Sequence, residues 1–386
     1  MEDSRRHRLL WNIAYYPIRA ALCLRFNYHP KVRPIEGPSI IVSNHVTDLD
    51  PLLLALTVRR FTYFVASEHV FRRFGKLLTW AQGPISRMKG TTASSTAMTI
   101  LRRVRKGFNV AIFPEANRTF NGVNLEIVES TAKLIRSSGA SLVTHRFRGG
   151  YFTSPRWSGN SIRRGRMTGE IVNIYPPEEL KKMKPEEIAD IIRRDIAEDA
   201  YATQAEWKIP YKGKNLAEHI ERTLCVCPSC GSLGTLESKG GGFSCRSCGL
   251  TGEYTELGYL EGEGLPFSTV TEWDRWQAGE LQKRADAAGE DCVAEDDGVE
   301  LHEVDDDFRE FPVSAGTLRI FADRLELADR RFPFRDISGI AINGPQLLTL
   351  TLRDKHYTFT SKRIVNLRKY ITLFHAFTAP EKILSL

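Results

Sequence analysis

Short apolar runs alternate with helical patterns through the first half of the chain. The runs Ile40–Val42 and Val110–Ile112 are continuously apolar, which is typical of strands buried on both faces of a sheet. Residues 52–56 and 91–106 follow helical patterns, and Gly107 is placed to end the second helix. This order predicts an α/β domain built on a mixed or largely parallel sheet over roughly residues 1–210.

The last part of the chain has a different pattern. Segments such as Thr317–Phe321 and Leu347–Leu352 have the composition of short strands, and an amphipathic helix is expected from about Lys362. A run of strands closed by one helix resembles the pleckstrin-homology fold. Such a β-rich domain would bind lipid headgroups or a protein partner, or brace the rest of the chain.

Four cysteines lie between these two regions. Cys227 and Cys230 form one C-x2-C pair, Cys245 and Cys248 form another, and 14 residues separate the pairs. With a glycine after each pair, this spacing predicts a four-cysteine zinc ribbon. Four thiolates leave no open coordination position, so the zinc would be structural and not catalytic. A redox dithiol is the alternative, and Cys225 is an alternative ligand.

The length of 386 residues favours several domains. The acidic cluster from Glu290 to Asp297 predicts a solvated linker before the β-rich region. The expected divisions are an N-terminal membrane-contact helix region (1–33), an α/β catalytic domain (34–215), the zinc ribbon (222–256), a helix and acidic linker (257–298) and the β-rich domain with its C-terminal helix (299–386).

Charge and hydropathy narrow the range of partners. The formal net charge of +7 is too mild to indicate nucleic acid by itself, and the ribbon lacks interleaved basic and aromatic residues. No apolar stretch approaches the ~20 residues that a bilayer span needs, and no secretory signal is recognisable. Thiolate ligation favours a reducing compartment. These features predict a cytoplasmic protein.

The N-terminal segment is the candidate membrane contact. Residues 5–26 combine aromatic and aliphatic side chains with flanking arginines, a composition that suits a helix lying in the plane of a membrane surface. The alternative is a helix packed on the core of its own domain. With membrane contact, the expected location is peripheral, on the inner face of the cell membrane.

Candidate chemistry follows each of the two apolar runs. His45 and Asp50 come after the first run, five positions apart and just before Pro51. A histidine oriented by a carboxylate is a suitable general base near neutral pH. Proline favours the first helical position, which makes Asp50 a plausible N-cap and lets a turn bring the two side chains together. Asp48 is a weaker candidate for the carboxylate.

The second run leads into Phe113-Pro114-Glu115-Ala116-Asn117-Arg118. Together the two motifs resemble the His-x4-Asp and Phe-Pro-Glu-Gly-Thr-Arg signatures of the glycerolipid acyltransferases of the lysophosphatidate acyltransferase type. The resemblance implies that His45 is the general base and Asp50 its partner. It also implies that Arg118 contacts substrate phosphate, while Glu115 positions the acceptor or stabilises its loop.

The segment Gly83–Gly90 stands where this family carries a further substrate-binding block. The resemblance makes Arg87 the first candidate for phosphate binding and Lys89 the second, because arginine offers a planar fork and lysine a point charge. Two departures concern the backbone. Ala116 replaces the family's glycine, and Thr144 stands where a proline is expected in a later block.

The resemblance implies an O-acyltransferase. It would move a fatty acyl group from acyl-CoA or acyl-carrier protein to a lysophospholipid, most simply 1-acylglycerol 3-phosphate, to give phosphatidate in phospholipid biosynthesis. The family needs no catalytic metal. Two alternatives stay open: an acyltransferase acting on another lysophospholipid or on glycerol 3-phosphate, and a membrane-associated scaffold that has lost the activity.

Overall fold

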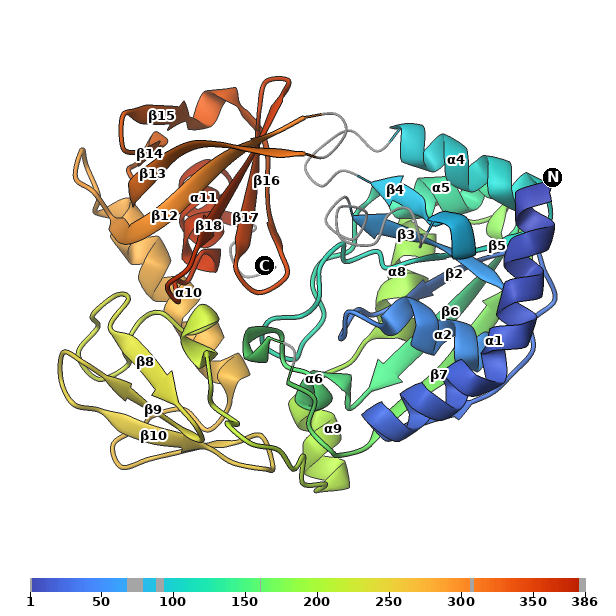
Figure 1. The fold of residues 1–386 in the computed structure, drawn as a ribbon, viewed down its shortest axis with the longest axis horizontal. Coiled ribbons are helices and arrows are strands. Elements are labelled where there is room, and N and C mark those ends of the chain that lie inside the picture. Colours follow the sequence, from blue (N-terminus) through green and yellow to red (C-terminus); the bar gives the residue numbers. More distant parts are fainter. Residues whose placement is uncertain (1, 68–78, 88–93, 160, 306–308, 382–386) are drawn as a thin grey trace. The chain divides into compact units, whose positions relative to one another are not determined.

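The computed structural model describes residues 2–67, 79–87, 94–159, 161–305 and 309–381 (Figure 1). The chain forms two compact units. Among the described residues, the first unit takes in those up to 87, 94–155 and 162–212, and the second takes in 156–159, 161 and those from 213 to 381.

A mixed sheet forms the centre of the first unit, with strand order β1-β7-β6-β2-β5-β3-β4. Only the β6–β7 pair is antiparallel among the strand pairs described in this sheet, so the predicted mixed, largely parallel sheet is confirmed. The strands are β1 (Tyr28–Lys31), β2 (Ser39–Ser43), β3 (Thr62–Ser67), β4 (Ile85–Arg87), β5 (Asn109–Ile112), β6 (Ser141–Arg148) and β7 (Met167–Tyr175).

Helices pack against this sheet. In Figure 1, α2 lies in front of the sheet and α8 lies behind it. Contacts join α1 to α2 and β1, and join α8 to α5 and β6. The helices are α1 (Glu2–Phe26), α2 (Asp50–Val58), α4 (Ser94–Arg105), α5 (Ser130–Ser138), α6 (Gly150–Thr153), α7 (Pro177–Leu180), α8 (Pro185–Ile196) and α9 (Ala200–Trp207).

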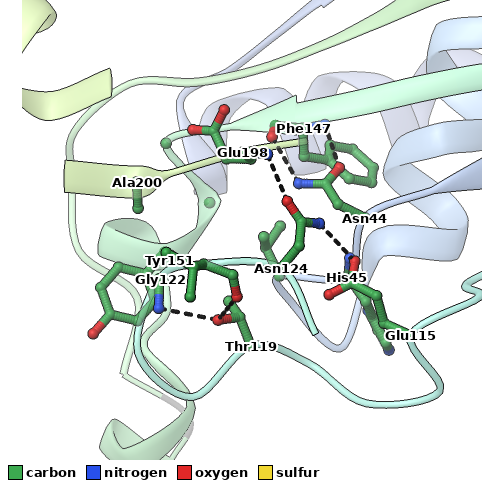
Figure 2. A pocket seen from close by; sticks show the side chains of 14 residues that line it. Asn44, His45, Glu115, Thr119, Gly122, Asn124, Phe147, Tyr151, Glu198 and Ala200 are labelled. Carbon is green, nitrogen blue, oxygen red and sulfur yellow. Dashed lines mark hydrogen bonds between the residues drawn. The ribbon is translucent and has the colours of Figure 1, made fainter. Parts of the chain in front are cut away.

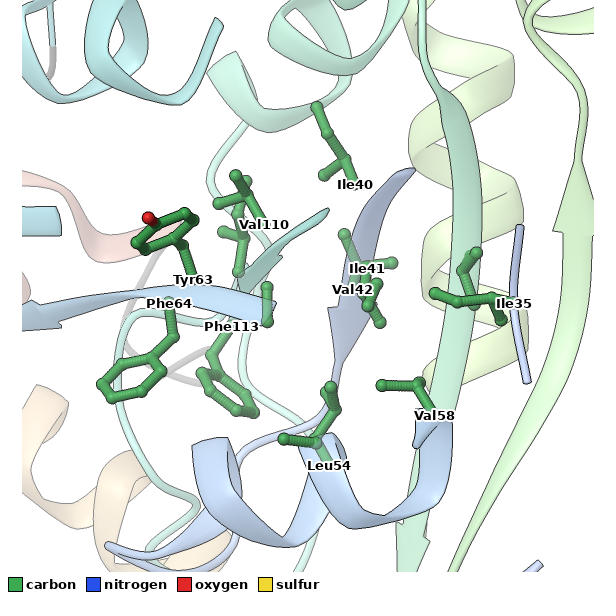
Figure 3. Packing of buried hydrophobic residues seen from close by; sticks show 14 of the residues in the cluster. Ile35, Ile40, Ile41, Val42, Leu54, Val58, Tyr63, Phe64, Val110 and Phe113 are labelled. Carbon is green, nitrogen blue, oxygen red and sulfur yellow. The ribbon is translucent and has the colours of Figure 1, made fainter. Parts of the chain in front are cut away.

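The core explains how the two motifs meet. Every residue of β2 is buried, as expected for a central strand covered on both faces, and Leu54 and Val58 of α2 belong to the same apolar cluster (Figure 3). Strands β2 and β5 are parallel neighbours, with Val42 opposite Ile112. Their carboxyl ends therefore lie side by side, and the motif that follows each strand begins at the same edge of the sheet.

The second unit begins with an antiparallel sheet of order β11-β10-β9-β8, followed by α10 (Val270–Asp286). A seven-stranded antiparallel sheet then has the order β15-β14-β13-β12-β18-β17-β16 and is followed by α11 (Arg368–Thr378), so the predicted β-rich region ending in a helix is confirmed. The strands are β8 (Leu236–Lys239), β9 (Gly242–Cys245), β10 (Thr251–Tyr254), β11 (Leu260–Glu261), β12 (Ala294–Val304), β13 (Glu310–Ile320), β14 (Arg324–Leu327), β15 (Arg330–Pro333), β16 (Ile337–Asn343), β17 (Leu347–Leu352) and β18 (Lys355–Ser361).

The prediction of a solvated acidic linker was wrong for its last residues. Strand β12 begins at Ala294 and includes the acidic residues 295–297. Their charges have partners on neighbouring elements: Glu295 pairs with Arg319 at 2.9 Å, and Asp296 accepts a hydrogen bond from the Tyr370 hydroxyl at 2.8 Å. The sequence pattern predicted residues 295–297 as part of a solvated linker, but they belong to a strand and their charges have partners. The closing helix also begins later than predicted, at Arg368.

One short segment of the chain belongs to a different unit from the residues on either side of it. Residues Arg156–Ser161 belong to the second unit by their contacts, although the chain on either side of them belongs to the first. The 3-10 helix Arg156–Ser158 in this segment is fully buried. Trp157 lies edge-on to Tyr254 of β10, with 5.5 Å between ring centroids. The second unit thus incorporates part of the connection between β6 and β7.

Candidate active site and cysteine cluster

The carboxylate of Asp50 organises the loop that follows β2. One of its oxygens lies 2.8 Å from Nδ1 of His45, and the Asp50 side chain is completely buried. The carboxylate also accepts hydrogen bonds from the backbone N–H of Val46 at 2.6 Å and from the Thr47 hydroxyl at 2.6 Å. Because a carboxylate only accepts, the proton in the His45–Asp50 bond lies on Nδ1, and Nε2 of the neutral imidazole keeps its lone pair.

Asp50 does not cap α2 as the sequence indicated. The helix begins at Asp50, Leu49 occupies the N-cap position, and no side chain caps the helix there. The carboxylate instead accepts from N–H groups of the preceding loop, including that of Thr47 at 2.9 Å. The turn that brings Asp50 to His45 therefore depends on these loop bonds, with Pro51 in the first turn of the helix as expected.

The imidazole of His45 is held on a second side by an aromatic ring. Phe113, which follows β5, stacks on it with 4.4 Å between centroids and an interplanar angle of 24°. The His45 side chain is 20% exposed, so it reaches the surface of the site while its orientation is fixed. Asp48, the weaker candidate, does not take the carboxylate role: it pairs with Arg118.

Glu115 joins loops together within the site. One oxygen accepts from the backbone N–H of His45 at 3.2 Å and from the Asn124 amide at 2.9 Å, and the other accepts from the Leu125 N–H at 2.8 Å. Burial raises the pKa of Glu115 to about 8, and these three hydrogen bonds oppose the rise. Of the two roles that the sequence left open for Glu115, its described contacts match stabilisation of the loop.

Arg118 is buried, with its side chain 5% exposed, and it donates to three protein oxygens. Its Nε donates to the Val46 carbonyl at 3.0 Å, one terminal nitrogen to Asp48 at 2.9 Å, and the other to the Ser154 carbonyl at 2.6 Å. In this conformation Arg118 clamps the loop that follows His45. The Asp48 side chain is exposed, so a substrate phosphate could reach the Arg118 guanidinium by replacing this bond.

The other candidate phosphate ligands are described only in part. Arg87 ends β4, and its side chain lies outside the described residues, as does the whole of Lys89. Strand β4 is the edge strand of the sheet and pairs with β3 in parallel. The phosphate-binding roles of Arg87 and Lys89 therefore stay predictions.

A pocket borders His45 (Figure 2). Asn124 lies on its wall, donating to Glu115 and accepting from the backbone N–H of Glu198 at 2.5 Å. Burial raises the pKa of Glu198 to about 7. The lining residues are Asn44, His45, Val46, Glu115, Thr119, Gly122, Val123, Asn124, Phe147, Gly149, Gly150, Tyr151, Glu198 and Ala200.

Two residues that contribute hydrogen bonds to this site were not predicted from the sequence. The Asn44 amide is buried and both accepts from Phe147 N–H at 2.8 Å and donates to the Phe147 carbonyl at 2.9 Å, which ties the loop after β2 to β6. Asn124 is the second. Asn44 could have been found from its place beside His45, directly after a buried strand. Asn124 carries no local signal, because its partners are distant in the sequence.

The two departures from the family motifs have structural consequences. Ala116 has φ of 60°, in the left-handed region that favours glycine, so an alanine at this position costs some strain that the family's glycine would avoid. Thr144 is buried, and its hydroxyl donates to Asp195 at 2.8 Å while accepting from Asn173 N–H at 3.0 Å. A proline could make neither bond, so this residue serves a polar network that joins β6, β7 and α8.

The four cysteines of the predicted ribbon come together in the second unit. The Sγ atoms of Cys227, Cys230, Cys245 and Cys248 all lie within 4.8 Å of one another. Cys227 and Cys248 are 3.7 Å apart, and Cys230 and Cys245 are 3.8 Å apart. Thiolates bound to a tetrahedral zinc at about 2.3 Å would be about 3.8 Å apart, so this cluster fits a metal ion.

The backbone around the cysteines has matching geometry on both sides. Gly231 and Gly249 have φ of 71° and 77°, and each donates its N–H at 2.9 Å to the carbonyl of the first cysteine in its pair. Only glycine adopts this conformation without strain, so both turns fold the chain over the sulfur atoms. Cys225 is buried and lies outside the cluster.

A buried carboxylate orients a histidine at the carboxyl ends of parallel strands, an arrangement that suits proton transfer. Comparison with known proteins narrows the class: residues 25–148 match the family model described as Acyltransferase. These residues therefore form a domain of the acyltransferase family, and this domain carries His45 and Asp50.

Among solved structures, the chain is similar to the 1-acyl-sn-glycerophosphate (LPA) acyltransferase PlsC from Thermotoga maritima. It is 18% identical, has a TM-score of 0.40, and the match covers 51% of this chain and 81% of that chain. No curated protein matches the chain.

Proposed function

We propose that the protein is an O-acyltransferase that moves a fatty acyl group from acyl-CoA or acyl-carrier protein to the free hydroxyl of 1-acylglycerol 3-phosphate, giving phosphatidate. The observation that carries the proposal is the His45–Asp50 hydrogen bond at 2.8 Å inside a domain of the acyltransferase family. The name of the Thermotoga enzyme motivates the choice of acceptor.

His45 acts as general base in this proposal. Its Nε2 takes the proton of the acceptor hydroxyl as that oxygen attacks the thioester carbonyl, and the imidazolium then returns the proton to the departing thiolate. Asp50 holds the Nδ1 proton and stabilises the imidazolium that forms. Glu115 fixes the His45 backbone, and Arg87, Lys89 and Arg118 are the proposed phosphate contacts, with Arg118 exchanging its bond to Asp48.

Helix α1 supports contact with a membrane surface. The buried face includes Trp11, Tyr15, Leu22 and Phe26, so the helix packs on its own domain. The opposite face carries Leu9, Ile13, Tyr16 and Leu24, which are 60–73% exposed. Apolar side chains exposed along one face, in a helix that also exposes Arg5, Arg8 and Arg25, suit a helix in the headgroup region of an anionic bilayer.

No helix of the described ranges combines the length and the apolar composition needed to cross a bilayer. From the exposed apolar face of α1, we propose peripheral contact through this helix, on the inner face of the cell membrane, where a lysophospholipid acceptor would lie.

We further propose that the cysteine cluster holds zinc. A zinc ion there would link the two cysteine pairs. The first pair also rests on α10, because the Trp273 indole donates to the Val226 carbonyl at 2.9 Å and the Gln277 amide oxygen accepts from the Cys225 N–H at 2.8 Å. The ion would thus stabilise the packing of α10 against the ribbon.

The proposed reaction is tested by offering purified protein lysophosphatidate, other lysophospholipids and glycerol 3-phosphate, each with acyl-CoA or acyl-carrier protein. We expect phosphatidate from lysophosphatidate, and a loss of about 10³-fold or more in turnover for His45→Ala and Asp50→Asn. His29→Ala, which removes an exposed histidine of β1, is the matched control and should leave turnover unchanged. Transfer that persists in His45→Ala would exclude the proposed base, and product from none of the acceptors would exclude the activity.

The membrane proposal is tested by sedimentation with vesicles of phosphatidylglycerol and phosphatidylethanolamine. Replacing Leu9, Ile13 and Leu24 with serine should weaken binding by about 100-fold, because each lost side chain removes roughly 1 kcal/mol of apolar transfer free energy. The matched control replaces Leu257, Phe311 and Ile364, which are exposed apolar residues of the second unit. Equal binding by both triple variants would contradict a specific role for α1.

The zinc proposal is tested by metal analysis of the purified protein. We expect about one zinc ion per chain, its loss in Cys245→Ser, and a lowered unfolding temperature in that variant, since structural zinc contributes directly to folding free energy. Cys292→Ser, which removes a cysteine outside the cluster, should keep the ion. Another metal at full occupancy, or no metal in protein prepared without chelator, would overturn the assignment to zinc.

A further inference from the structure

The loop that follows β5 holds both backbone polar groups of His45. The Glu115 carboxylate accepts a hydrogen bond from the His45 N–H at 3.2 Å, and the Thr119 N–H donates to the His45 carbonyl at 3.0 Å. With its backbone held on both sides, the imidazole takes its direction from the contacts with Asp50 and Phe113. The placement of the base therefore depends on how firmly Glu115 is itself held.

The Glu115 carboxylate is buried, with 5% of the residue exposed, and its three described donors are all N–H groups. Two of them belong to the backbone, at His45 and Leu125. The third is the side-chain amide of Asn124, which lies 2.9 Å away. A buried carboxylate is costly in free energy unless donors surround it. The Asn124 amide therefore contributes directly to the stability of Glu115 in this position.

The amide of Asn124 is fixed at both ends (Figure 2). Its Nδ2 donates to Glu115, and its Oδ1 accepts from the backbone N–H of Glu198 at 2.5 Å. The reversed amide would place its NH2 group against an N–H and its oxygen against a carboxylate, so the two partners define which end faces Glu115. Asn124 cannot turn away from Glu115 without also giving up its bond to Glu198.

The segment that follows α8 is joined to the loop that carries Asn124. The Ala200 N–H donates to the Gly122 carbonyl at 2.9 Å, and Val123 forms an isolated antiparallel bridge with Asp199. Backbone bonds thus surround Asn124 on the side away from the base. The position of its amide is set by the framework of the first unit and not by an isolated surface loop.

We propose that Asn124 is a positioning residue for acyl transfer: it takes its place from the backbone of Glu198 and holds the Glu115 carboxylate against the His45 N–H. Asn124 acts through Glu115 and not on the reacting atoms. The proposal rests on the proposed function for its kinetic test only, since the ionisation of Glu115 can be measured without a substrate.

The ionisation of Glu115 reports on this contact. Burial raises the pKa of Glu115 to about 8, its three donors oppose the rise, and the negative charge of Asp50 adds to it. Of the other titratable groups around it, His45 donates its backbone N–H, and Glu198 is linked to it through Asn124. Removing the Asn124 donor should therefore raise the pKa of Glu115 further.

The direction of the pH effect follows from the acceptor strength of Glu115. An ionised carboxylate is a stronger acceptor for the His45 N–H than a protonated carboxyl group. Turnover should therefore be highest above the pKa of Glu115 and fall as the pH drops through it. Loss of the Asn124 donor should move this acid side of the pH profile to higher pH.

The test measures kcat and KM of the full-length protein as a function of pH. For Asn124→Ala we expect kcat to fall about tenfold at neutral pH, with KM for donor and acceptor within about twofold of wild type, because misplacing a reacting group costs rate more than binding. The acid side of the kcat profile should move to higher pH. Asn124→Asp keeps the acceptor for the Glu198 N–H but loses the donor to Glu115, and it should show at least the same shift.

A double-mutant cycle identifies the residue through which Asn124 acts. In the Glu115→Gln background, where the side chain cannot ionise, Asn124→Ala should cost less than about twofold further, because two residues that act through one contact are not additive. Asn173→Ala is the matched control. It removes an amide that donates to Asp195 at 3.0 Å in the network of β7 and α8, and it should keep the wild-type pH profile.

Three results would overturn the proposal: a loss of kcat in Asn124→Ala with the wild-type pH profile, an equal loss in both Glu115 backgrounds, or a raised KM with unchanged kcat. If Asn124→Ala does not fold, Asn124→Asp carries the test. If the wild-type protein transfers no acyl group, the proposed function fails, and carbon-13 NMR of glutamate-labelled protein decides this inference. The pKa of Glu115 should then be higher in Asn124→Ala than in wild type, and an unchanged pKa would overturn the inference.

Discussion

A buried carboxylate is stable only where donors surround it, and Asp50 receives its donors from the loop that carries the base. Val46 N–H, Thr47 N–H and the Thr47 hydroxyl all converge on Asp50, and His45 adds Nδ1. These bonds fold the loop and select the imidazole tautomer at the same time. The surrounding elements serve this arrangement: β2 delivers the loop, β5 delivers Phe113 and Glu115, and Arg118 holds the loop from outside.

Features set by adjacent residues could be predicted from the sequence. The buried strands, the His45–Asp50 pair and the four cysteines all follow from short-range patterns, because a buried strand or a C-x2-C turn is specified by its own residues. The contacts of Arg118 were harder to predict. Its motif marks the residue as important, but its partners include the Ser154 carbonyl, which comes near only through the packed β6–α6 connection. Asp296 was misread for the same reason: its partner Tyr370 lies far along the chain.

Side-chain contacts hold the elements of the second unit together. Its ribbon is tied to α10 through Trp273 and Gln277, and α10 is tied to α11 through the buried pair Asp274–Arg368. Buried ion pairs are weak contributors to net stability but are costly to break singly, so they fix the relative placement of the elements that they join. The same unit incorporates Arg156–Ser161.

The central claim is that Asp50 holds His45 with its proton on Nδ1, leaving Nε2 as the base. It is tested most directly by nitrogen-15 and proton NMR of protein labelled at histidine, with His45→Ala used to assign the signals. The account predicts that neutral His45 shows a protonated Nδ1 in a strong hydrogen bond and an unprotonated Nε2, and that Asp50→Asn abolishes this pattern. A neutral His45 with its proton on Nε2 in the wild-type protein would contradict the account.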